Sequence, residues 1–186
     1  MESELIQKVL EGDANAFRYF IEKYRDMAYT LAMSIVKDAP IAEEVTQDAF
    51  LKAYRSLDKF EQRSKFSTWL YKIVTNEGLK HLRKKEFKYA EDITELNNIE
   101  YSEINESISG LTEQEQKYYI NRSLERLLPN DCLVLRLFYL DERSLKEIRE
   151  ITGFSNTNIK TILHRARKRF YAFLKEDLKH EVKSII

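Results

Sequence analysis

The sequence contains little of what a disulfide-bonded, turn-rich or membrane-spanning protein needs. A single cysteine, Cys132, excludes an internal disulfide and is consistent with a reducing compartment. Four glycines and two prolines are few for a β-rich fold with many tight turns. The chain has no apolar run near the roughly 20 residues that cross a bilayer, and its start lacks the basic flank and apolar core of a signal peptide. We therefore expect a cytoplasmic protein without membrane insertion.

The sequence also lacks the residue sets on which catalytic sites are built. Its three histidines are scattered, and it has neither a glycine-rich phosphate loop nor metal-ligand spacing. We expect no enzyme activity, no cofactor and no metal. Cys132 is most simply a small buried apolar residue.

Helix-forming residues dominate the composition, and they predict an all-α fold. Helices are expected at residues 2–11, 13–37, 40–57 and 66–85, and again at 113–127, 129–139, 144–151 and 156–175. Pro40 and Pro129 suit first helical turns, and Ser144 with Glu147 has the spacing of a capping box. The expected organisation is two small helical domains, residues 1–90 and 113–180, joined by an acidic linker at 91–112.

The zero net charge of the chain conceals a strong segregation of charge. Residues 63–88 carry a balance of +6, residues 155–175 another +6, and residues 91–121 between them −7. Two basic patches separated by an acidic connector indicate two contacts with a polyanion such as nucleic acid. Two helix faces that are merely solvated would give the same charges. The residue patterns within each patch have to distinguish this alternative from nucleic-acid binding.

Residues 144–170 have the spacing of a helix-turn-helix, with Gly153 in the turn and Ser155 placed to cap the second helix. Apolar residues fall on one side of the second helix, and amides, hydroxyls and cations fall on the other. The N-terminal part of such a helix reads base edges in the major groove, while cations further along hold phosphates. The candidate readers are Asn156, Thr157, Asn158, Lys160 and Thr161, with His164 and Ser155 beside them. Arg165, Arg167, Lys168 and Arg169 are better suited to phosphates.

The helix expected at residues 66–85 has one apolar and one cationic side. Phe66, Trp69, Leu70, Ile73 and Val74 cluster on the first, so Trp69 is interpreted as a core residue rather than a base-stacking platform. The other side carries Lys65, Lys72, Asn76, Lys80 and Arg83. A cationic stripe with an amide and nearby aromatics suits unpaired bases, and Phe60 and Phe66 are alternative stacking candidates.

Three blocks of the sequence, residues 16–60, 65–84 and 128–170, resemble in order and spacing the small extracytoplasmic-function (ECF) class of bacterial RNA polymerase sigma factor. The first block contains AEEVTQDAF and the second KFSTWLYKIVTNEGLKHLRK. The resemblance implies a sigma region 2-like helix bundle, and a region 4-like helix-turn-helix after the linker. It departs from the family at Arg149, where a small residue is usual, and at Ile162, where arginine is frequent, so it does not imply a particular minus-thirty-five sequence.

The resemblance also implies partners and site residues. The first domain would dock on core RNA polymerase through Glu44, Gln47 and Asp48, and would open the minus-ten element of promoter DNA. A flipped base would be captured by the loop from Asp58 to Ser67 together with Asn76, while Lys72, Lys80, Arg83 and Lys84 would hold phosphates. The second domain would read the minus-thirty-five duplex. Family members are often held inactive by an anti-sigma factor, which is a further candidate partner.

One alternative function remains compatible with the basic C-terminal helix. A helix-turn-helix regulator that binds duplex DNA without polymerase would carry the same helix. It would give no reason for the Glu44, Gln47 and Asp48 face or for the tryptophan-containing helix, and a pull-down with core polymerase separates the two.

Overall fold

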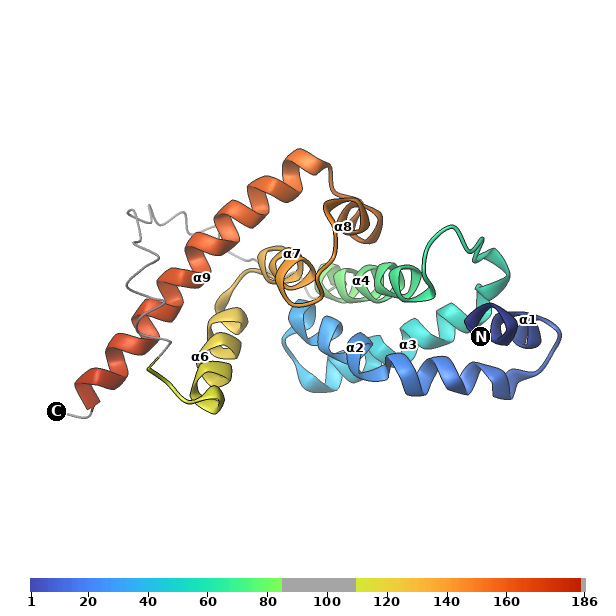
Figure 1. Cartoon of the computed structure of the whole chain (residues 1–186), viewed down its shortest axis with the longest axis horizontal. Coiled ribbons are helices and arrows are strands. Elements are labelled where there is room, and N and C mark those ends of the chain that lie inside the picture. Colours follow the sequence, from blue (N-terminus) through green and yellow to red (C-terminus); the bar gives the residue numbers. More distant parts are fainter. Residues whose placement is uncertain (85–109, 185–186) are drawn as a thin grey trace. The chain divides into compact units, whose positions relative to one another are not determined.

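The computed structural model describes residues 1–84 and 110–184, with side chains described except those of Lys84 and residues 179–184. Every regular element in these ranges is helical, so the predicted all-α class is confirmed (Figure 1). Most of the predicted acidic linker and Lys85 lie outside the described residues. The contacts divide the described chain into two compact units, residues 1–84 with 143–155, and residues 110–142 with 156–184.

The first unit begins with α1 (Glu2–Leu10), the 3-10 turn η1 (Ala14–Phe17) and α2 (Arg18–Val36). It continues through α3 (Ala39–Arg55), the 3-10 turn η2 (Leu57–Lys59) and α4 (Phe66–Lys84). The helix expected to start at residue 13 therefore opens with a 3-10 turn, in which Asp13 accepts a hydrogen bond from the backbone N–H of Asn15 at 3.0 Å. Asp38 caps α3 in the same manner through the N–H of Ile41 at 3.1 Å, and Pro40 lies in its first turn as predicted.

Helices α2, α3 and α4 pack against one another and form the core of the first unit. Phe20, Leu31 and Leu70 are among the side chains buried between them. Gly78 favours the close approach of α4 to α2, because a Cβ atom at this position would lie 3.1 Å from Cγ2 of Ile35 and would require that side chain to shift. The packing fixes which side of α4 remains exposed.

Helix α8 (Leu145–Thr152) also packs against α4 in this unit. The predicted capping box at its start is confirmed, since Glu147 accepts from the Ser144 N–H at 3.0 Å and donates its own N–H to the Ser144 hydroxyl at 3.3 Å. Gly153, with φ of 74°, ends the helix in the left-handed conformation that the turn requires. The contacts group residues 143–155 with the N-terminal helices, whereas the sequence groups them with the C-terminal ones. The domain boundaries at 90 and 113 thus stay a prediction.

The second unit consists of α6 (Glu113–Arg126), α7 (Pro129–Tyr139) and α9 (Asn156–Ser184). Both α6 and α7 pack against α9. One cluster of buried residues joins them: Leu124, Leu127, Cys132, Leu135 and Ala166. Cys132 is 4% exposed, in agreement with its interpretation as a buried apolar residue.

Candidate nucleic-acid and polymerase interfaces

Helix α4 separates an apolar side from a cationic side, as its sequence predicts. Phe66, Leu70 and Val74 are buried, and Trp69 is half-buried. The residues of the predicted minus-ten surface are exposed: Lys65, Lys72, Asn76, Lys80 and Arg83. At 100° per residue they fall within one stripe of the helix. Lys84 is the last residue of α4, and its side chain lies outside the described part.

Glu77 is a buried carboxylate on α4 that the sequence reasoning missed. It is 5% exposed and accepts from the ammonium nitrogens of Lys52 on α3, at 2.6 Å, and Lys80, at 3.3 Å. The hydrogen bond and charge of Lys52 hold the pKa of Glu77 below its ordinary value, against the opposing effect of burial, and Lys80 acts in the same direction. The charge of Lys80, one of the predicted phosphate-binding lysines, is therefore partly neutralised by Glu77 on the same helix.

The segment before α4 presents an aromatic cluster rather than a free ring. Phe60 is 9% exposed, and its ring centroid lies 5.0 Å from that of Trp69 and 5.8 Å from that of Phe66. Phe66 is buried further, against Phe20 at 4.3 Å. Of the predicted loop from Asp58 to Ser67, Asp58 lies in η2 and Ser67 in the first turn of α4, so residues 60–65 form the connection between the two helices. The cluster anchors this connection beside the start of the cationic stripe. A base stacks on a ring face, and the packing of Phe60 leaves little of its ring exposed for such a contact.

The N-terminal turns of α9 expose the side chains predicted to read base edges. Ser155, Asn156, Thr157, Asn158, Lys160, Thr161 and His164 are all exposed, while Ile159, Ile162 and Leu163 are buried. The hydroxyl of Thr161 donates to the backbone carbonyl of Thr157 at 3.0 Å, which leaves its lone pairs to accept. Arg149 of α8 is exposed, so this departure from the family pattern buries no charge.

The arginines further along α9 are held by a carboxylate of α7. Arg165 donates from Nε to both oxygens of Asp131, at 3.1 and 3.2 Å, and Arg169 donates to Asp131 at 2.9 Å. The Arg165 side chain is 41% exposed and that of Arg169 13%. Lys168 is half-buried, and Arg167 donates to the backbone carbonyl of Leu163 at 3.2 Å. The predicted phosphate-binding residues thus differ in how strongly they are fixed.

The predicted polymerase contacts lie on one exposed face of α3. Glu44, Gln47 and Asp48 are exposed, and His81 of α4 lies beside them with Nε2 at 3.8 Å from Oε1 of Glu44. Glu44, Asp48 and His81 each place one potential metal-ligating atom within 4.8 Å of the other two. Exposed carboxylates often lie this close without a metal, so we assign no metal here. His81 is a member of this face that the α3 sequence alone does not reveal.

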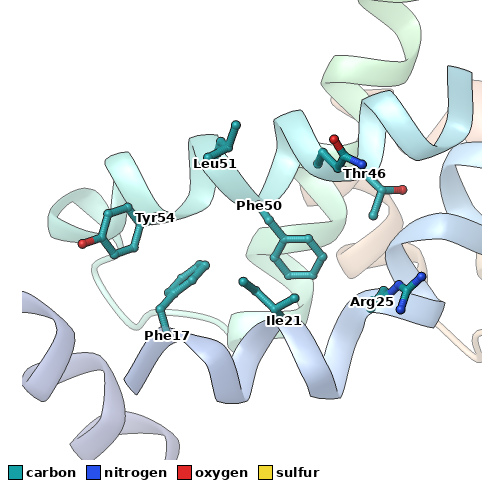
Figure 2. A pocket seen from close by; sticks show the side chains of 8 residues that line it. Phe17, Ile21, Arg25, Thr46, Phe50, Leu51 and Tyr54 are labelled. Atoms are coloured by element: carbon teal, nitrogen blue, oxygen red, sulfur yellow. The ribbon is translucent and has the colours of Figure 1, made fainter. Parts of the chain in front are cut away.

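An apolar groove runs between α2 and α3 next to this face (Figure 2). It encloses about 450 Å³ and is lined by Phe17, Ile21, Arg25, Thr46, Gln47, Phe50, Leu51 and Tyr54. Ile21, Leu51 and Tyr54 are 39%, 52% and 42% exposed, which is high for large apolar side chains. Gln47 belongs both to the groove and to the predicted polymerase face. The sequence did not reveal the groove, because its residues come from three elements, η1, α2 and α3.

Comparisons with known proteins place this arrangement in one family. Residues 20–87 match the model of Sigma-70 region 2, and residues 117–170 match that of Sigma-70, region 4. The ECF RNA polymerase sigma factor SigW of Bacillus subtilis is 34% identical over 179 residues, which cover 90% of this chain and 94% of SigW. The ECF RNA polymerase sigma-E factor of Escherichia coli is 29% identical over 171 residues, covering 88% of this chain and 89% of the relative.

Solved structures share the fold at lower sequence identity. The sigma factor RpoE of Bartonella quintana, in complex with the anti-sigma factor NepR, has a TM-score of 0.61 at 22% identity and covers 86% of this chain and 96% of its own. CnrH, in complex with the cytosolic domain of CnrY, has a TM-score of 0.59 at 18% identity and covers 93% of this chain and 96% of its own.

The chain belongs to the ECF class of RNA polymerase sigma factors. It is a promoter-directing subunit, and its partners are core RNA polymerase and promoter DNA. The polymerase-independent regulator is not favoured. Sigma factors are transcription initiation factors rather than enzymes. Among the described residues, no helix combines the length and the apolar content needed to cross a bilayer.

Proposed function

We propose that the exposed stripe of α4 binds the melted minus-ten strand. Its support is the position of Asn76 among four exposed cations, on the side of α4 opposite to the buried Leu70 and Val74. Cations there attract the strand backbone, and an amide can hydrogen-bond the edge of an unpaired base. The segment from Asp58 to Ser67, which joins η2 to α4, would complete the base pocket, with Phe60 at its edge. Lys84 would extend the phosphate contacts.

The N-terminal turns of α9 would read the minus-thirty-five duplex. Their exposed amides, hydroxyls and lysine suit base edges in a major groove, and Arg165 and Lys168 follow one and two turns later to meet phosphates. The observation that carries this assignment is the division of α9 between the buried Ile159, Ile162 and Leu163 and the exposed polar set. A helix that buries one side and offers such groups on the other can enter a groove without losing its core.

Core polymerase would dock on Glu44, Gln47 and Asp48, with the α2–α3 groove accepting an apolar part of the same partner. The support is the continuity of the two surfaces through Gln47. RpoE of Bartonella quintana is described in complex with an anti-sigma factor, and an anti-sigma factor is likewise a proposed partner of this chain. We further propose that the protein works in the cytoplasm without catalytic activity of its own.

Run-off transcription with core polymerase on a promoter library tests the whole proposal. The chain should direct initiation at defined sites that share a minus-ten and a minus-thirty-five element. Pull-down of core polymerase by the purified chain tests docking separately. A chain that binds duplex DNA but neither retains polymerase nor starts transcription would contradict the proposal.

A further inference from the structure

Asp131 is a carboxylate with no exposed surface in the first turn of α7. It binds two arginines that lie one turn apart on α9. Arg165 reaches it through Nε and through Nη2, the latter at 2.5 Å, and Arg169 through Nη1 at 2.9 Å. The carboxylate therefore ties α7 to the helix that carries the proposed base readers.

The two arginines are not equivalent in this arrangement. A buried carboxylate needs opposite charge and hydrogen bonds, and either guanidinium could supply part of them. Arg169 is 13% exposed, whereas Arg165 is 41% exposed and lies one turn after the exposed Thr161. Of the two guanidinium groups, that of Arg165 is therefore the more accessible to a DNA phosphate.

We propose that Asp131 is a positioning residue for recognition of the minus-thirty-five duplex. It holds the Arg165 guanidinium in place, so that Arg165 meets a DNA phosphate with little further loss of side-chain freedom. An unrestrained arginine would lose that freedom on binding, which weakens the contact. The inference rests on the proposed function of α9 as the duplex-reading helix.

Replacing Asp131 separates a positioning role from a purely electrostatic one, because the two predict opposite changes in the affinity for DNA. Asp131→Asn removes a negative charge close to a polyanion, so charge alone would strengthen DNA binding. Positioning predicts weaker binding, by about five- to tenfold, because Arg165 loses its anchor. The measurement is the affinity of holoenzyme, reconstituted from the full chain and core polymerase, for a promoter duplex selected by run-off transcription.

A double-mutant cycle shows whether Asp131 acts through Arg165. Arg165→Gln should lower the affinity by a similar factor and reduce the salt slope of log K by about 0.9, the value for one phosphate. The double variant Asp131→Asn with Arg165→Gln should then lose little more than either single variant. Multiplicative losses, or an affinity that rises in Asp131→Asn, would overturn the proposal.

Substitutions that keep a positive charge opposite Asp131 serve as controls for loss of folding. Arg165→Lys and Arg169→Lys make the same change on the two arms of the carboxylate. If Asp131 only joined α7 to α9, both variants would lower thermal stability and affinity alike. Positioning predicts that Arg165→Lys loses about fivefold more affinity than Arg169→Lys when the two are compared at equal fractions folded. Equal losses overturn the proposal, even if Asp131→Asn does not fold.

Asn158→Ala and Lys168→Ala distinguish failure of this inference from failure of the proposed function. Both should weaken duplex binding if α9 reads the minus-thirty-five element. If neither does, α9 is not the reading helix and both proposals fail. If both weaken binding while the Asp131 and Arg165 changes act independently, only the positioning role is wrong.

Discussion

The ammonium nitrogen of Lys52 lies 2.6 Å from a carboxylate oxygen of Glu77, which joins α3 to α4 in the first unit. Lys52 is 54% exposed at its side chain, whereas Glu77 is 7% exposed at its side chain. The carboxylate therefore depends on this lysine and on Lys80 for compensation. The pair connects the helix of the proposed polymerase face to the helix of the proposed minus-ten surface.

Replacing Glu77 should destabilise the first unit in a pH-dependent manner. Glu77→Gln should lower the free energy of unfolding near pH 7 by about 1–3 kcal/mol, since it removes a charge-assisted hydrogen bond from a buried site. The pKa of Glu77 is lowered in the folded protein, so its contribution is present above its ordinary pKa near 4.5 and is lost as pH falls through the lowered value. Urea unfolding at several pH values should show the two proteins converging in acid.

An exposed acid provides the control for this prediction. Glu61 pairs with Arg63, but both side chains are mostly exposed, at 65% and 84%. Glu61→Gln should change stability much less than Glu77→Gln, because exposed ion pairs contribute little. Equal effects of the two substitutions, or a pH-independent effect at Glu77, would show that the Lys52 contact is not a stabilising one.

Local signals in the sequence predicted most of the helices and both polar surfaces. The spacing of Ser144 and Glu147 predicted a capping box, and the period of Ile159, Ile162 and Ala166 predicted the buried side of α9. Such patterns extend over only a few residues, so the sequence of a single helix is enough to recognise them. The extension of α9 to Ser184 had a signal too, since residues 176–184 contain neither glycine nor proline.

The ion pairs between helices that hold the side chains of the candidate sites could not be predicted from such local patterns. Glu77 and Lys52 are 25 residues apart, and Asp131 and Arg165 are 34 apart. No local pattern indicates which of many acids and bases meet across two packed helices. The groove between α2 and α3 likewise depends on how two helices pack, which the amphipathic pattern of each leaves open.

Replacing Asn76 should weaken promoter opening and leave duplex binding intact. Asn76→Ala removes the only amide of the exposed α4 stripe without touching the buried side of the helix. We expect at least about a tenfold loss of open complex, the equivalent of one good hydrogen-bonded base contact. Permanganate reactivity of unpaired thymines measures opening, and holoenzyme affinity for an isolated minus-thirty-five duplex measures the other step. Equal losses in both measurements would contradict the assignment of Asn76 to a base pocket.

Replacing Asn158 and Lys168 should affect DNA binding in different ways. Asn158→Ala should cost about 1–3 kcal/mol at one promoter position and relax the preference there, since it is proposed to contact a base edge. Lys168→Ala should weaken binding to all sequences alike. It should also reduce the slope of log K against log salt concentration by about 0.9, the value for one phosphate. Affinities for a set of single-base promoter variants at several salt concentrations check both expectations. A sequence-dependent loss at Lys168 would reverse the assignment.

Reversing charge on the exposed face of α3 should release core polymerase. Glu44→Lys and Asp48→Lys should each weaken binding of core polymerase by about tenfold or more, because they place a cation where the partner is expected to meet carboxylates. Neither residue contributes to the core, so helical content and thermal stability should stay close to those of the wild type. Glu4→Lys, on α1 with a side chain that is 80% exposed, is the matched control and should retain full affinity. If all three variants bound polymerase equally well, docking would have to be sought on another surface, with the α2–α3 groove and its exposed Leu51 as the next one to test.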